Sequence, residues 1–113
     1  MMIRVEEYIS GEISPFRRWF DGLDTQAAAG VTVAIERLAE GNTSNVKPIG
    51  EGAAELKINR GPGYRLYFGW DGKTLVILLG GGTKRRQQND IAAALRRWRD
   101  YKKSKRRRMT PCH

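Results

Sequence analysis

The spacing of apolar residues in the N-terminal third predicts a short strand followed by two helices. Residues 4–10 contain β-branched and aromatic side chains and end before a glycine, which is typical of a strand. Ser14 and Pro15 form a helix start, because serine caps the first turn and proline suits its first position. Apolar side chains recur at helical spacing through residues 16–23 and again through residues 31–39. Since almost nothing separates these two helices, we expect them to form a hairpin.

The middle of the chain alternates between apolar and polar residues with a period of two, as strands do. Residues 42–52 are expected to form a loop by composition. Residues 54–59, 64–70 and 74–79 are predicted to be three successive strands, and the last is an unbroken apolar run of the kind buried on both faces of a sheet. The Asp71-Gly72 pair between the last two strands is a strong hairpin signal.

A final helix is predicted over residues 88–101, where Ile91 and Leu95 share one face. The element order is therefore β-α-α-β-β-β-α. We expect an α+β fold in which an antiparallel meander carries the N-terminal helical hairpin on one face, followed by a C-terminal helix. Residues 1–101 are expected to form a single domain, and residues 102–113 a basic, disordered tail.

The chain of 113 residues has a net charge of +9, which is concentrated near its C-terminal end. Residues 1–83 contain nine Lys/Arg and ten Asp/Glu, whereas residues 84–108 contain twelve Lys/Arg and two Asp. This asymmetry favours a polyanionic partner, either a nucleic acid or an acidic protein. The lack of a long apolar run and of a signal-peptide pattern predicts a cytoplasmic protein with no membrane partner. A single cysteine, Cys112, agrees with a reducing compartment.

Alternation also assigns the polar residues of the central hairpin to one side of the sheet. If Leu56 and Leu66 face the helices, then Lys57, Arg65 and Tyr67 face the opposite way, toward solvent. A basic, aromatic surface with no helix over it suits RNA, because cations bind phosphates and aromatic rings stack on unpaired bases. The candidate substrate-binding residues are Tyr64, Tyr67, Arg86, Arg96, Arg97 and Arg99.

No metal or cofactor site is expected. The one histidine, His113, follows Cys112 directly, and two adjacent ligands do not have metal-site spacing. The glycine run at residues 80–82 precedes Thr83 and Lys84 but lacks the spacing of a phosphate-binding loop, so we expect it to be a loop that ends a strand.

Four segments carry a resemblance to a known family. They read ELKI at residues 55–58, GPGYRLYF at 61–68, LLGGGTK at 78–84 and QQNDI at 87–91. In these segments the chain resembles the phage-derived, HigB-like addiction module killer proteins of the RelE/ParE toxin superfamily, over roughly residues 3–100. The resemblance implies a RelE-like fold and the toxin of a type II toxin–antitoxin system. It also implies ribosome-dependent cleavage of mRNA and, as a second partner, a cognate antitoxin that is expected to be a small helix-turn-helix protein.

The resemblance further implies a site of basic residues on the open sheet face and in the loop after it. Its catalytic candidates are Lys57, Arg60, Arg65, Lys84 and Arg85. Arg65 is expected to bind the scissile phosphate, because a guanidinium donates two parallel hydrogen bonds and keeps its charge. Lys57 is the candidate general base, and Glu55 is the alternative. The C-terminal aromatic or histidine residue that often completes such sites has no counterpart, since Asp90 and Ile91 stand there, and the general acid is left unassigned.

Two other functions are compatible with these residues. A ParE-like toxin would bind and poison DNA gyrase without cleaving nucleic acid, and it would not need the basic sheet face. A non-catalytic nucleic-acid-binding module would use the basic tail. The charges of Lys57, Arg60 and Arg65 favour the mRNA endonuclease, whereas the unassigned general acid favours the other two.

Overall fold

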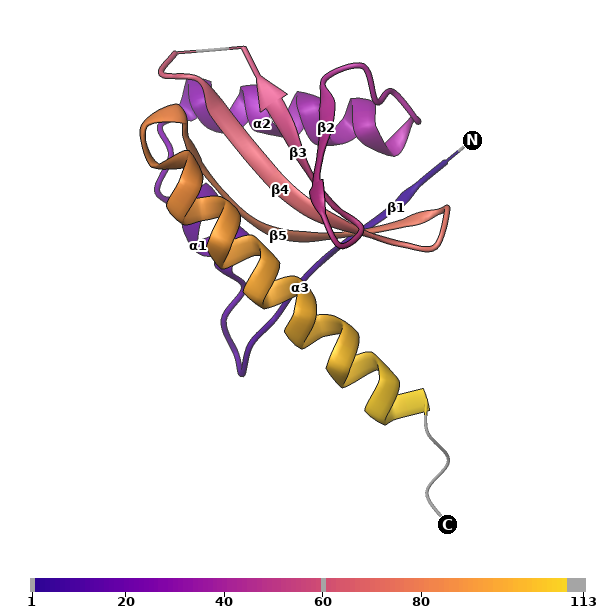
Figure 1. The fold of residues 1–113 in the computed structure, drawn as a ribbon. Coiled ribbons are helices and arrows are strands. Elements are labelled where there is room, and N and C mark those ends of the chain that lie inside the picture. The colour runs from indigo at the N-terminus through magenta and orange to yellow at the C-terminus, as the bar shows by residue number, and fades with distance from the viewer. Residues whose placement is uncertain (1, 60, 110–113) are drawn as a thin grey trace.

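The chain folds into a five-stranded sheet with helices on both faces (Figure 1). The computed structural model describes residues 2–59 and 61–109. The elements in chain order are β1 (Arg4–Glu7), α1 (Pro15–Asp21), α2 (Thr25–Ala39), β2 (Val46–Gly50), β3 (Ala53–Ile58), β4 (Tyr64–Asp71), β5 (Leu75–Thr83), the 3-10 turn η1 (Lys84–Arg86) and α3 (Gln87–Met109). The predicted α+β class is therefore confirmed.

The expected antiparallel meander forms only the centre of the sheet, as β3, β4 and β5, and a further strand lies at each edge. The strand order is β1-β5-β4-β3-β2, and β1 pairs with β5 in parallel at one edge. At the other edge lies β2, an antiparallel partner of β3. The segment 42–52 was expected to be a loop, but that expectation is wrong, since Val46–Gly50 forms the strand β2. Pro48 and the nearby glycines are typical of loops, so the sequence did not indicate this strand. An edge position tolerates a proline, since one side of the strand needs no hydrogen bonds.

Helices α1 and α2 cover the face of the sheet to which the apolar residues were assigned. The first helix starts as expected, because Ser14 Oγ accepts a hydrogen bond from the Arg17 N–H (3.0 Å). The second is capped by Asp24, whose Oδ1 accepts one from the Ala27 N–H (2.8 Å). Phe16 of α1 is buried in the core that these helices form with the sheet. The strand residues in this core are Ala54, Leu56, Ile58, Leu66, Phe68, Val76 and Leu78, together with Val31 and Leu38 of α2. The inward assignment of the apolar strand positions is confirmed.

The opposite face of the sheet is covered by α3, and the expectation of an open face is wrong (Figure 1). Ala94 and Trp98 of α3 are buried against Tyr67 and Leu79 of the sheet. The helix can approach closely because glycines stand beneath it: a Cβ at Gly69 would overlap the Trp98 indole. Trp98 also donates a hydrogen bond from Nε1 to the Glu51 carbonyl (2.7 Å), which fixes its orientation.

The helix α3 extends to Met109, beyond the expected end at Tyr101 (Figure 1). From Gln87 to Met109 the sequence has no glycine or proline, and lysine and arginine are good helix formers, so nothing stops the helix earlier. Tyr101 and Lys105 both bind the Asp71 carboxylate at the far end of the sheet. Of the helices in the described ranges, none combines the length and the apolar character that crossing a membrane requires.

Candidate functional site

A polar cluster is buried between the sheet and the first turn of α3. Arg65 Nε lies 3.4 Å from Glu55 Oε1, and both side chains are nearly inaccessible. The other carboxylate oxygen of Glu55 accepts a hydrogen bond from Gln87 Nε2 (2.8 Å), and Arg65 Nη1 donates to the Gly63 carbonyl (3.2 Å). Alternation placed Arg65 on the correct side of β4, but the expectation that it faces solvent is wrong, because α3 closes over it.

Tyr67 lies beside this pair and is also buried, so the expectation that it stacks on RNA bases from a solvent-facing position is wrong. Its register partner on β3 is Glu55. The Tyr67 hydroxyl has no hydrogen-bond partner within residues 2–59 and 61–109. Burial raises the pKa of this phenol, and the negative charges of Glu55 and Asp90 raise it further. The hydroxyl is therefore held protonated, close to the Glu55 carboxylate.

The glycine run at residues 80–82 was expected to be a loop that ends a strand, but it lies inside β5, so that expectation is wrong. It makes room for two charged residues of α3. A Cβ at Gly82 would overlap the Asp90 carboxylate, and one at Gly80 would collide with the Arg97 guanidinium. A register shift opposite Tyr67 leaves Leu79 outside the regular pairing, and Arg97 Nη1 donates to the Leu79 carbonyl (2.9 Å). Burial raises the pKa of Asp90, although Arg86 and Arg97 counteract this effect.

Exposed cations surround the cluster at the end of the sheet where β3 and β5 finish. Lys57 is exposed on β3 and is the register partner of Arg65, and Lys84, Arg85 and Arg86 are exposed in η1. The Lys84 N–H donates to the Gly63 carbonyl (3.0 Å), the oxygen that also accepts from Arg65. Together Lys57, Lys84, Arg85 and Arg86 form a basic rim. None of these four side chains forms an ion pair with another described residue.

The remaining candidates do not join the rim. Tyr64 is half-buried and meets Trp19 edge-on on the other face of the sheet, with ring centroids 6.3 Å apart. Arg97 is half-buried over Gly80, and both oxygens of the Glu51 carboxylate accept hydrogen bonds from Arg99. Arg96 is exposed on α3. Arg60 lies outside the described residues.

Sequence reasoning missed the partners that neutralise Arg65. Glu55 was considered only as an alternative base, and Gln87 was not considered. One signal was present: an acid and an arginine at positions that share a strand face commonly pair when that face is buried. The glycines at positions 69, 80 and 82 were a second signal, because strand glycines often mark a close approach of another element.

The rim is chemically suited to bind a polyanion. Four cations that form no ion pair within the described part of the chain can each contact a phosphate, and their positions at the end of the sheet allow one strand of nucleic acid to touch several of them. Within the described residues, no three Cys, His, Asp or Glu side chains gather where they could hold a metal ion. The chemistry that the site can offer thus consists of cations at the surface and a carboxylate, Asp90, next to them.

Comparison with known proteins gives two matches. Residues 18–99 match the family described as phage-derived protein Gp49-like (DUF891), and this match spans the buried cluster and the whole basic rim. The chain is also similar to an uncharacterized protein of Haemophilus influenzae, with 40% identity over 64 residues. That alignment covers 56% of this chain and 65% of the Haemophilus protein, which is slightly less than two thirds of its length.

Proposed function

The chain belongs to the phage-derived Gp49-like family, a toxin-like family of the RelE/HigB type, and on that premise we propose that it is the toxin of a toxin–antitoxin pair that cleaves mRNA on the ribosome. The observation that carries the proposal is the basic rim. Four exposed cations with no ion-pair partner among residues 2–59 and 61–109 stand together at one end of the sheet, where a solvated surface would usually mix both signs of charge.

The rim residues are proposed to bind the RNA backbone around the scissile phosphate. RNA supplies its own nucleophile, the 2′-hydroxyl, so the protein must align the strand, stabilise the added negative charge and transfer protons. Lys84 and Arg85 would supply the positive charge. Lys57 would act instead as the base, with its uncharged amine taking the 2′-hydroxyl proton.

Arg65 takes a different role from the one expected of it. A guanidinium on a side chain that is 7% exposed and paired with Glu55 is not free to bind a phosphate. Arg65 Nη1 and the Lys84 N–H instead donate to the same Gly63 carbonyl, so Arg65 helps to fix the backbone of Lys84. Arg65 is therefore a positioning residue. Asp90 is proposed as the proton donor to the leaving oxygen, because it lies over Gly82 near Arg86 and its raised pKa favours the acid form.

The experiment that tests the toxin role is controlled expression in a bacterium. Induction of this chain alone should stop growth, and co-expression of the small helix-turn-helix protein expected from the adjacent reading frame should restore it. Normal growth at high expression of folded protein would contradict the proposal. A chain that stops growth by blocking gyrase supercoiling, with mRNA left intact, would be a ParE-like poison instead.

A further inference from the structure

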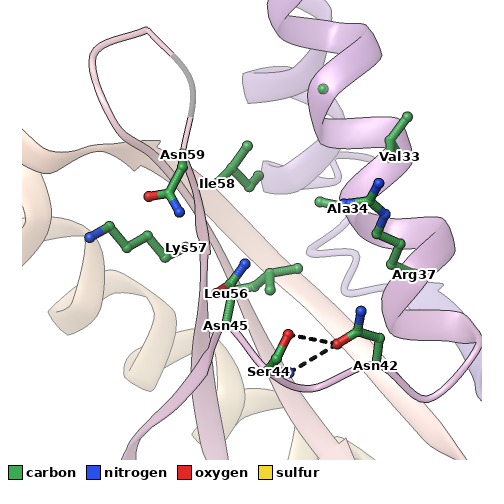
Figure 2. A pocket seen from close by; sticks show the side chains of 11 residues that line it. Val33, Ala34, Arg37, Asn42, Ser44, Asn45, Leu56, Lys57, Ile58 and Asn59 are labelled. Atoms are coloured by element: carbon green, nitrogen blue, oxygen red, sulfur yellow. Dashed lines mark hydrogen bonds between the residues drawn. The ribbon is translucent and has the colours of Figure 1, made fainter.

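A pocket of about 380 Å³ lies between α2, the residues before β2 and the end of β3 (Figure 2). This volume is within the range of sites that hold small organic ligands. Val33 and Ala34 of α2 form one wall, and Leu56 and Ile58 of β3 form the opposite wall (Figure 2). These two sides define a slot whose accessible surface is mainly polar, and Val33 is 43% exposed beside it.

One end of the slot carries hydrogen-bonding groups whose orientation is fixed. Asn42 Oδ1 accepts hydrogen bonds from Ser44 N (3.1 Å) and from Ser44 Oγ (2.8 Å), as the dashed lines in Figure 2 show. With its oxygen occupied twice, Asn42 keeps its NH₂ group as a donor. Asn45 also lines the pocket, and its backbone carbonyl accepts from the Lys57 N–H (3.1 Å), which ties this end of the slot to β3.

The pocket is free of negative charge. Its lining includes Arg37 and Lys57 but no aspartate or glutamate, and neither cation forms an ion pair with another described residue. Lys57 extends on the opposite side of β3 from Leu56 and Ile58 (Figure 2). Since Lys57 also belongs to the basic rim, the pocket and the rim are separated only by the strand β3.

We infer that this pocket binds one base of a single-stranded RNA whose backbone lies across the basic rim. The inference rests on the proposed function and adds a base-binding subsite to it. A nucleobase has flat faces, which can pack beside Val33 and Ala34, and a polar edge with acceptors, which suits the NH₂ group that Asn42 keeps as a donor. Unpaired bases turned away from their backbone are what proteins use to read RNA sequence. An acidic peptide would use Arg37 and Lys57 but would leave the oriented amide without a specific role.

The test is a titration of the full-length protein with AMP, GMP, CMP and UMP, followed by NMR signals of the Asn42 and Asn45 side-chain amides and the Val33 methyl groups. At least one nucleotide should shift these signals in a saturable way. Val33→Glu places a carboxylate in the slot and should weaken that binding by about tenfold or more. Ala29→Glu is the matched control, because it adds the same charge to an exposed position of α2 that does not line the pocket.

Three results would overturn the inference: no saturable shift at the pocket, equal affinity in Val33→Glu and Ala29→Glu, or pocket signals that respond to an antitoxin and to no nucleotide. Nucleotide binding is measured without cleavage, so the two proposals fail separately. A protein that cleaves mRNA with unchanged base preference in Val33→Glu would keep the proposed function and lose the subsite. A protein that binds a nucleotide in the pocket but cleaves no RNA would keep the subsite and lose the endonuclease.

Discussion

Glu55 and Arg65 form an ion pair that is enclosed between the sheet and α3, with side chains that are 6% and 7% exposed, respectively. Because water cannot reach either charge, each depends on the other for its compensation. Gln87 donates to Glu55 and Arg65 donates to the Gly63 carbonyl, whereas Arg65 Nε has no hydrogen-bond partner among the described residues. The pair thus connects β3 and β4 to the start of α3, close to the point where the basic rim begins.

Replacement of Arg65 by alanine should destabilise the fold strongly. The change leaves the Glu55 carboxylate buried without a counter-charge, which typically costs about 3–5 kcal/mol. Urea unfolding of Arg65→Ala should show a loss of that size in the free energy of unfolding. Arg96→Ala is the control, because Arg96 is exposed on α3 and its loss should change stability by no more than about 0.5 kcal/mol. Equal stability of the two variants would show that the pair is not enclosed in solution.

A methyl group at Gly69 should disturb the packing of α3 on the sheet. A Cβ there would overlap the Trp98 indole, and overpacking of this kind costs about 1–3 kcal/mol. Thermal unfolding of Gly69→Ala should show a lower Tm together with changed Trp fluorescence. Gly22→Ala serves as the comparison, because the atom nearest to the added Cβ would be the Trp19 carbonyl oxygen at 3.5 Å and the Gly22 φ of −85° suits alanine. If both variants behaved alike, α3 would not lie against β4.

The sequence predicted one face of the sheet well and the other poorly, for a physical reason. Alternation determines which side of a strand a residue occupies, so Leu56 and Arg65 were assigned to the correct sides. It cannot determine whether another element covers that side. The covering helix was predicted, but its position depends on contacts over long sequence separations, such as Trp98 with the Glu51 carbonyl and Tyr8 with Asp100.

The exposed part of the site was easier to predict. Lys57 is exposed as alternation requires, and the cations after β5 are exposed because they form a short turn between two elements. The edge strand β2 was missed since Pro48 and the neighbouring glycines are typical of loops. The late end of α3 was missed because a run of cations was interpreted as a disordered tail, although lysine and arginine do not oppose a helix.

Asp71 should make stability depend on pH in the acid range. Its pKa is lowered, first by the hydrogen bond from Lys105 and then by that from Tyr101. A carboxyl group whose pKa is lower in the folded state contributes stability above its unfolded pKa, and this contribution is lost as pH falls through the folded value. The loss attributable to Asp71 should therefore appear below about pH 4.

The measurement is the free energy of unfolding of the wild type and Asp71→Asn at a series of pH values. The difference between the two proteins should be greatest at neutral pH and should shrink as the pH falls below about 4. Asp90 acts in the opposite direction because its pKa is raised, but it is present in both proteins and cancels in the comparison. A difference that stays constant with pH would contradict the assigned role of Asp71.

RNA binding by the basic rim should be sensitive to salt. Each cation that contacts a phosphate releases condensed counterions, so each removal should reduce the slope of log K against log salt by roughly 0.7 for a single strand. The double variant Lys84→Ala/Arg85→Ala should therefore bind a short single-stranded RNA more weakly and with a slope smaller by about 1.4. Fluorescence anisotropy at several salt concentrations measures both quantities.

A matched double variant controls for the loss of positive charge. Lys47→Ala/Lys73→Ala removes the same charge from exposed positions on β2 and in the β4–β5 turn, outside the rim. Its salt slope should remain close to that of the wild type. A similar reduction of the slope in both double variants would mean that RNA binds through overall charge, and no particular role would remain for η1.

The central claim is that the basic rim is where mRNA is cleaved, and the most direct test is cleavage in a translating-ribosome reaction with mapped RNA ends. The triple variant Lys57→Ala/Lys84→Ala/Arg85→Ala should keep the wild-type Tm, because all three side chains are exposed. It should cleave more slowly by roughly 10²-fold or more, the scale of losing charge stabilisation at a reacting centre, while Arg96→Ala cleaves normally. Undiminished cleavage by the triple variant, or intact mRNA with the wild-type protein, would contradict the account.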